Sequence, residues 1–184
     1  RPISLQYTGN IKDKIVIVGA TFEGRNMTAT ISDGNEKKEV SKTLPENTFL
    51  ASFLNYMMLQ SGVSEGKKFS YRALAEEDLG VYKGEVLIQE KTTHRGVAAY
   101  KLCNKFKGSR WLSHISERGG VLSLHSPVQK IGLRLVKDPQ KAIEGNENAS
   151  KTIKSLFGKM PSGQHNALTD DSNVEPKNSQ NSEE

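Results

Sequence analysis

The chain has 184 residues, a formal net charge of +5 and only 35% hydrophobic residues, a share below that of most globular proteins. Its single cysteine, Cys103, excludes an intrachain disulfide and any metal site that needs several cysteines. No stretch reaches the roughly 18 apolar residues that a membrane-spanning helix requires. The length is that of one domain with a tail.

The first 44 residues alternate between β-like runs and turn residues. Four runs are rich in β-branched or alternating apolar residues: 3–7, 14–22, 26–32 and 39–44. The turn signal Asp33-Gly34 separates the last two of these runs. Period-two alternation with short turns is typical of antiparallel hairpins, so this region is predicted to form a meander of strands.

The periodicity becomes helical over residues 49–60. Apolar residues recur there on one stripe: Phe49, Leu50, Phe53, Leu54, Met57 and Met58. Asn47 or Thr48 can cap this segment, and Gly62 can end it. We therefore predict one amphipathic helix over 49–60, whose apolar stripe must be covered by the sheet.

Strand-like runs return after Gly66 and become longer. They are residues 67–75, 82–91, 97–106, 110–116, 121–125 and 129–136. Asp138 followed by Pro139 then predicts a short C-terminal helix over 138–143. The pattern indicates a mainly β, β-rich α+β fold with an antiparallel sheet. Two architectures fit it: a curved sheet or half-barrel around the 49–60 helix, which we favour, and a β-sandwich with a helical insertion.

The composition changes near the C-terminus. From Lys159 onward the chain holds two lysines, five acidic residues and few apolar side chains. Such a segment buries too little apolar surface to offset the entropy of ordering. We predict a single β-rich domain over 1–158 and a disordered polar tail over 159–184. The basic residues of the body are scattered, so nucleic-acid binding is not expected.

The stretch that most resembles an active site is 104–127, which holds the only tryptophan, Trp111, and two of the four histidines. We interpret it as a hairpin that turns at Gly119-Gly120. His94 lies about six strand residues from Cys103, too far for a Cys–His pair. The histidines also lack the close spacing of zinc ligands. We therefore expect no catalytic residues, no metal and no cofactor.

Residues 49–127 combine a short helical segment, a strand pair around Gly96, and a strand that returns through Arg118-Gly119-Gly120-Val121-Leu122. This layout resembles a class of bacterial exported domains of unknown function. Some of them are similar to half-barrel lipoprotein carriers, which hold acyl chains between a curved sheet and helices. The resemblance implies a periplasmic or envelope-associated, non-enzymatic β-domain. Because the chain enters strand-like sequence directly after Arg1-Pro2, we expect an exported form whose leader has been removed.

We expect a structural or protein-interaction module with an unknown protein partner, not an enzyme. The alternative is a carrier of an apolar or lipid ligand, held in a pocket between the sheet and the 49–60 helix. The candidate pocket residues are Phe49, Phe53, Met57, Met58 and Trp111. Methionine suits adaptable apolar contacts, and ligand pockets are mostly apolar.

Overall fold

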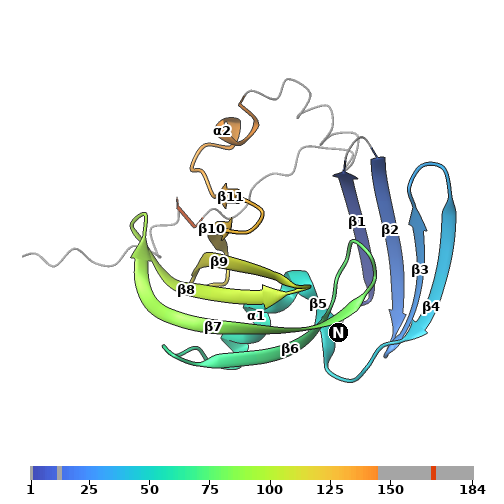
Figure 1. Cartoon of the computed structure of the whole chain (residues 1–184), viewed down its shortest axis with the longest axis horizontal. Coiled ribbons are helices and arrows are strands. Elements are labelled where there is room, and N and C mark those ends of the chain that lie inside the picture. The colour runs from blue at the N-terminus through green and yellow to red at the C-terminus, as the bar shows by residue number, and fades with distance from the viewer. Residues whose placement is uncertain (1, 12–13, 145–166, 169–184) are drawn as a thin grey trace, which may run out of the picture. The chain divides into compact units, whose positions relative to one another are not determined.

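The computed structural model describes residues 2–11, 14–144 and 167–168. Within them the protein is mainly β, with two sheets that do not close into a barrel, one principal helix and a short second helix (Figure 1). The predicted fold class is therefore confirmed. The strands form two sheets rather than one, because the N-terminal strands pair only with each other.

The N-terminal sheet has four strands in sequence order. They are β1 (Ser4–Ile11), β2 (Lys14–Glu23), β3 (Asn26–Ser32) and β4 (Lys37–Thr43). All neighbouring pairs are antiparallel. One face is apolar and buried, with Val18, Phe22 and Met27 at its centre, whereas the other carries hydroxyl side chains. This alternation is the one that the sequence pattern predicted.

The second sheet has seven strands in the order β11-β10-β9-β8-β7-β6-β5. Their bounds are β5 (Thr48–Leu50), β6 (Lys68–Leu74), β7 (Val81–His94), β8 (Val97–Phe106), β9 (Ser109–Ser116), β10 (Val121–Ser126) and β11 (Ile131–Arg134). Short turns with positive φ at Arg95-Gly96 and Lys107-Gly108 join β7 to β8 and β8 to β9. The stretch around Trp111 is a hairpin, as predicted, since β9 and β10 pair antiparallel.

The principal helix begins later than the predicted 49–60 segment. Phe49 and Leu50 belong to β5, which pairs in parallel with β6, and a 3-10 turn over Ala51–Phe53 leads into α1 (Leu54–Gln60). Strand pairing at this point outweighs the helical periodicity. Neither predicted cap residue is used, but the chain does leave the helix at Gly62, where φ is 79°.

The second helix, α2 (Pro139–Ile143), forms where the sequence predicted it. The Asp138 side chain accepts a hydrogen bond from the Gln140 N–H at 2.9 Å, and proline follows Asp138. No helix in the described residues is long and apolar enough to cross a membrane.

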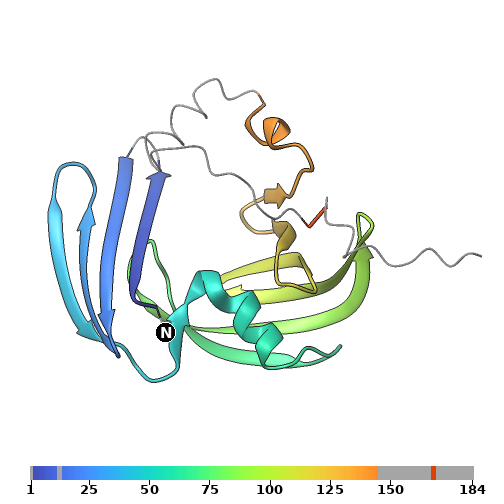
Figure 2. The ribbon, with the colours of Figure 1, turned by 180° about the vertical axis from the view of Figure 1, so that it is seen from behind.

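The described residues divide into two compact units. Unit 1 takes in the described parts of 1–62, 68–86 and 105–109, and unit 2 those of 63–67, 87–104 and 110–184. In unit 1, the buried face of the four-stranded sheet packs against Leu50, Leu74 and Leu79. Helix α1 lies beside β6 of the same unit, with Leu54 packed against Tyr71 (Figure 2).

The core of unit 2 includes two residues of the predicted polar tail. Ala167 and Leu168 are buried against Val97, Ala99 and Leu122. They are two of the few apolar residues after position 158. The remainder of the predicted tail, 159–166 and 169–184, lies outside the described residues.

Candidate binding surface

Aromatic side chains gather on unit 1 where β5, β6, β7 and β8 carry them together. We call this set the aromatic cluster: Phe49, Phe69, Tyr71, Tyr82 and Phe106. The Tyr71 ring is central, with centroids 5.7 Å from Phe49, 6.3 Å from Phe69 and 5.8 Å from Phe106. Phe106 also meets Tyr82 edge to face at 5.9 Å. These separations are those of favourable aromatic pairs.

Gly84 of β7 makes room for the central ring. A Cβ atom at this position would overlap the Tyr71 ring, and the backbone of Gly84 has no positive φ that would itself require glycine. The glycine therefore serves packing rather than turn geometry. Tyr71 is almost fully buried as a result, whereas Phe49, Phe69 and Phe106 each keep part of their surface exposed.

The helix beside this cluster presents a second apolar surface. Leu54 and Met58 point into the protein, but the side chains of Phe53, Tyr56 and Met57 are 45%, 56% and 36% exposed. The Phe53 and Tyr56 rings lie 6.4 Å apart. We call Phe53, Tyr56 and Met57 the helix patch. Contiguous exposed apolar side chains are characteristic of interaction sites.

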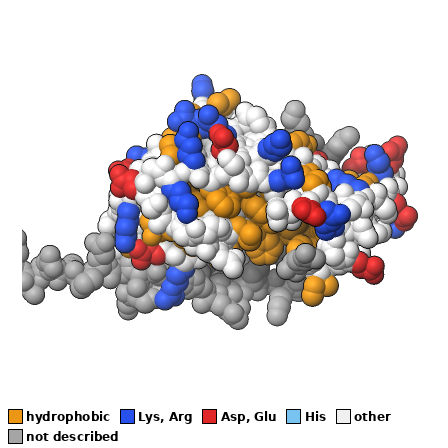
Figure 3. Space-filling view, turned by 90° about the horizontal axis from the view of Figure 1, so that it is seen from below, with side chains coloured by type: hydrophobic (Ala, Val, Ile, Leu, Met, Phe, Trp, Pro, Cys, Tyr) orange, Lys and Arg blue, Asp and Glu red, His pale blue; other side chains and the backbone are white. Residues whose placement is uncertain are grey.

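Basic and hydrophobic side chains lie together on one face of the molecule. Figure 3, seen from below Figure 1, shows hydrophobic side chains gathered near the centre of the face and Lys and Arg side chains around them. Phe106 itself borders a shallow hollow of about 330 Å³, whose other lining side chains include Lys83, Glu85, Lys105 and Lys107. Lys83 and Lys105 are exposed there.

Lys107 is already neutralised within unit 1. Its ammonium lies 2.5 Å from Glu77 and 2.7 Å from Asp78, and 5.0 Å from the centre of the Tyr82 ring. Asp78 also accepts hydrogen bonds from the Tyr82 hydroxyl at 2.9 Å and the Gly80 N–H at 2.7 Å. This network fixes the β8–β9 turn against the 76–80 loop, and with it the positions of Phe106 and Tyr82.

The same network sets the protonation of its members. Partial burial alone would raise the pKa of Asp78, but its hydrogen bonds to Lys107, Gly80 and Tyr82 outweigh burial and lower that pKa. Burial would lower the pKa of Lys107, but the hydrogen bonds that its ammonium donates to Asp78 and Glu77 raise it instead. Both Asp78 and Lys107 are therefore charged across the physiological pH range. Of the lysines that line the hollow, Lys83 and Lys105 form no ion pair with a carboxylate among the described residues.

The five predicted pocket residues lie in different settings. Phe49 is part of the aromatic cluster, Phe53 and Met57 belong to the helix patch, and Met58 is 1% exposed in the core. Trp111 lies half-buried on β9 in unit 2. None of them lines either of the two hollows found in unit 1. The sequence singled out two residues of the helix patch but missed Tyr56, Phe69, Tyr71, Tyr82 and Phe106.

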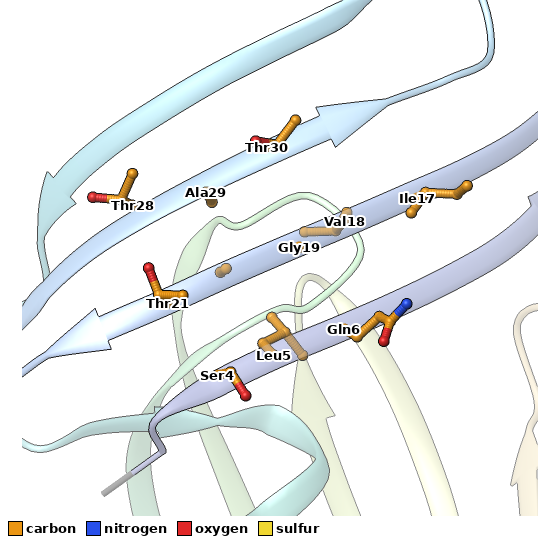
Figure 4. A pocket seen from close by; sticks show the side chains of 11 residues that line it. Ser4, Leu5, Gln6, Ile17, Val18, Gly19, Thr21, Thr28, Ala29 and Thr30 are labelled. Carbon is orange, nitrogen blue, oxygen red and sulfur yellow. The ribbon is translucent and has the colours of Figure 1, made fainter. Parts of the chain in front are cut away.

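The larger hollow, of about 500 Å³, lies on the exposed face of the four-stranded sheet (Figure 4). It is centred on Gly19, which leaves the β2 backbone bare, and is bordered by Gln6, Thr28 and Thr30. It is shallow and open to solvent, and apolar side chains such as Leu5 and Ile17 line it together with the threonines, so it is not an enclosed site.

Cys103, the single cysteine of the chain, lies on β8. It is buried, and its sulfur lies 3.2 Å from Arg110 Nε, with no histidine hydrogen-bonded to it among the described residues. In the same part of the chain, no three His, Cys, Asp or Glu side chains are grouped as metal ligands.

Two histidines do form a pair that the sequence did not predict. The His94 and His114 rings stack at 4.1 Å in unit 2, and His114 Nδ1 lies 2.9 Å from Ser123 Oγ. Burial, followed by the nearby charge of Arg95, lowers the pKa of His94, and burial, His94 and Lys101 lower the pKa of His114. Both rings are therefore neutral at pH 7 and act as packing groups.

Comparisons with family models, with curated proteins and with solved structures found no match to this chain.

Proposed function

We propose that this protein is a non-enzymatic interaction module that binds an apolar, acidic segment of a partner protein through unit 1. The observation that carries the proposal is the exposure of Phe53, in the 3-10 turn, and of Tyr56 and Met57 on α1, beside an aromatic cluster that is itself partly exposed. Aromatic and methionine side chains are enriched at the cores of protein interfaces, and tyrosine is among the residues that contribute most of the binding energy there.

The acidic character of the partner follows from the charges beside the cluster. Lys107 is paired with Glu77 and Asp78. Lys83 and Lys105 are exposed at the hollow that Phe106 borders, where they outnumber the one exposed carboxylate, that of Glu85. A carboxylate next to an apolar side chain of the partner would meet these two lysines while the apolar side chain contacts the aromatic rings. Such charge complementarity sets partner choice and register.

The exposed geometry favours this reading over a carrier of an apolar ligand. A carrier needs an enclosed apolar pocket, whereas Met58 fills the core and Phe53 and Met57 face outward. The periplasm or cell envelope is the location we propose, on the strength of the resemblance of residues 49–127 to exported bacterial domains.

The proposal is tested with a fluorescein-labelled peptide in which leucine and phenylalanine alternate with glutamate, titrated with the full chain. The variant carries Phe53→Ser and Tyr56→Ser, both at exposed positions, so its fold should persist. The matched control carries Val128→Ser and Leu133→Ser, which are exposed apolar residues of unit 2.

We expect the wild type and the control to bind the peptide alike, and the helix-patch variant to bind at least about tenfold more weakly, a loss of about 1.4 kcal/mol. A peptide with lysine in place of glutamate should bind less than the acidic one. No peptide binding by the wild type, or equal loss in the control variant, would contradict the proposal. Binding to anionic phospholipid vesicles but not to the peptide would replace it with a lipid-surface function.

A further inference from the structure

The four-stranded sheet has two edges of different character. The β4 edge carries three lysines and a glutamate in seven residues, with Lys37 and Lys38 exposed. Charged side chains, lysine above all, are a common way to prevent an edge strand from pairing with another chain. The β1 edge, SLQYTGNI, contains no charged residue and no proline.

The backbone groups that face the open edge of β1 follow from its register with β2. Ser4 is opposite Thr21, and the Phe22 N–H donates to the Ile3 carbonyl at 3.0 Å. In an antiparallel pair, hydrogen-bonded and non-hydrogen-bonded positions alternate. The odd-numbered residues of β1 therefore bond to β2, and Ser4, Gln6 and Thr8 direct their N–H and C=O groups to the open edge. Within the described residues, β2 is the strand that pairs with β1.

From these features we infer that β1 adds to the β1 strand of a second copy of this chain, in antiparallel orientation about a two-fold axis at Gln6. Ser4 of each copy then pairs with Thr8 of the other. These are the positions whose backbone groups are open, so hydrogen-bond parity is satisfied at three successive pairs. Residues opposite each other in this register also point to the same face of the sheet. The two four-stranded sheets therefore join into one eight-stranded sheet whose buried side chains all lie on one face.

The side chains of β1 suit a second copy in particular. A neutral strand pairs with itself without like-charge repulsion, whereas two β4 strands would oppose lysines. In the Gln6-centred register Ile3, which is 83% exposed, lies opposite Gly9 of the other copy. Within each copy the Tyr7 ring lies over Gly9, so Ile3 of one copy contacts the Tyr7 ring of the other copy across the new interface.

The exposed face of the sheet allows this continuation. Ser4, Thr21, Thr28 and Ser41 are directly opposed across all four strands and form a row of hydroxyl groups. Figure 4 shows Ser4 and Gln6 at the β1 end of this face, with threonines of β2 and β3 on the same side. Such a face needs no rearrangement when the sheet is extended past β1.

Sedimentation velocity of the full chain, from about 1 µM to about 100 µM, tests the inference, since that range resolves dissociation constants of micromolar order. Gln6→Lys places two lysines opposite one another at the two-fold axis, and Gln6→Pro removes an N–H that faces the open edge. The matched control is Thr30→Lys, which adds the same charge on the same face and in the same cross-strand row, but at β3.

We expect the wild type and Thr30→Lys to dimerise with the same dissociation constant, and Gln6→Lys to weaken dimerisation at least about tenfold. Gln6→Pro should be monomeric, and if it fails to fold, Gln6→Lys decides. A wild type that is monomeric at every concentration would overturn the inference. So would dimers that Gln6→Lys leaves intact, or that Thr30→Lys weakens as much as Gln6→Lys does.

Discussion

Replacement of Gly84 by alanine tests how the aromatic cluster is built. The added Cβ would overlap the Tyr71 ring, which is buried between its neighbours and cannot move away without losing contacts to Phe49 and Phe106. Overpacking of this kind costs about 1–3 kcal/mol. For a chain of this length, 1 kcal/mol corresponds to about 2–4 °C in Tm, so Gly84→Ala should lower Tm by about 2–12 °C.

The second half of the experiment removes the obstacle. In a Tyr71→Ala background, itself destabilised by about 3–5 kcal/mol, the Cβ at position 84 no longer meets the ring atoms that are its three nearest neighbours. Alanine is also about 0.5–1 kcal/mol better than glycine inside a strand. Gly84→Ala should therefore be neutral or stabilising there, and the double-mutant cycle by urea unfolding should give a coupling of about 1–3 kcal/mol. An equal cost of Gly84→Ala in both backgrounds would refute the packing argument.

Three further outcomes are expected. The pKa values of His94 and His114 are lowered in the folded state, so the unfolded chain takes up protons first as the pH falls. The urea concentration at the unfolding midpoint should therefore be constant above about pH 6.5 and fall below it. A midpoint that stays level down to about pH 5 would contradict this. Leu168→Ala should lower the free energy of unfolding by about 2 kcal/mol, since Leu168 is buried in unit 2; an unchanged denaturation curve would mean that this contact does not persist in solution. Lys107→Met should lower it by about 1 kcal/mol and shift the pKa of Asp78 upward, measurable by NMR titration, and an unmoved Asp78 titration would show that the ion pair is absent.

Much of the fold could be predicted from local patterns. Strand β3 and strand β8 were predicted with the bounds that the structure shows, since period-two alternation and flanking turn residues agree at both. The C-terminal helix followed from Asp138 and Pro139. The start of α1 could not be predicted from the sequence, because Phe49 and Leu50 also fit a helical stripe. Only their pairing with β6, about 24 residues away, makes them a strand.

The candidate surface could be predicted only in part. Apolar periodicity drew attention to Phe53 and Met57, but it could not tell which side of the helix faces solvent. The aromatic cluster joins residues from four strands, and the order of those strands is a tertiary property. A weak signal was present at Gly84, a glycine within a strand run, which often marks a close approach by another group. The stacking of His94 and His114, 20 residues apart in sequence, left no such local trace.

Our proposal is that unit 1 binds an acidic, apolar protein segment at the helix patch and the aromatic cluster. Chemical-shift mapping on the isotope-labelled full chain, with the leucine, phenylalanine and glutamate peptide as the probe, tests it most directly. We expect the largest shifts at Phe53, Tyr56, Met57, Lys105 and Phe106, with little change on β10 and β11. Shifts confined to β10 and β11, or no shifts at saturating peptide, would contradict it.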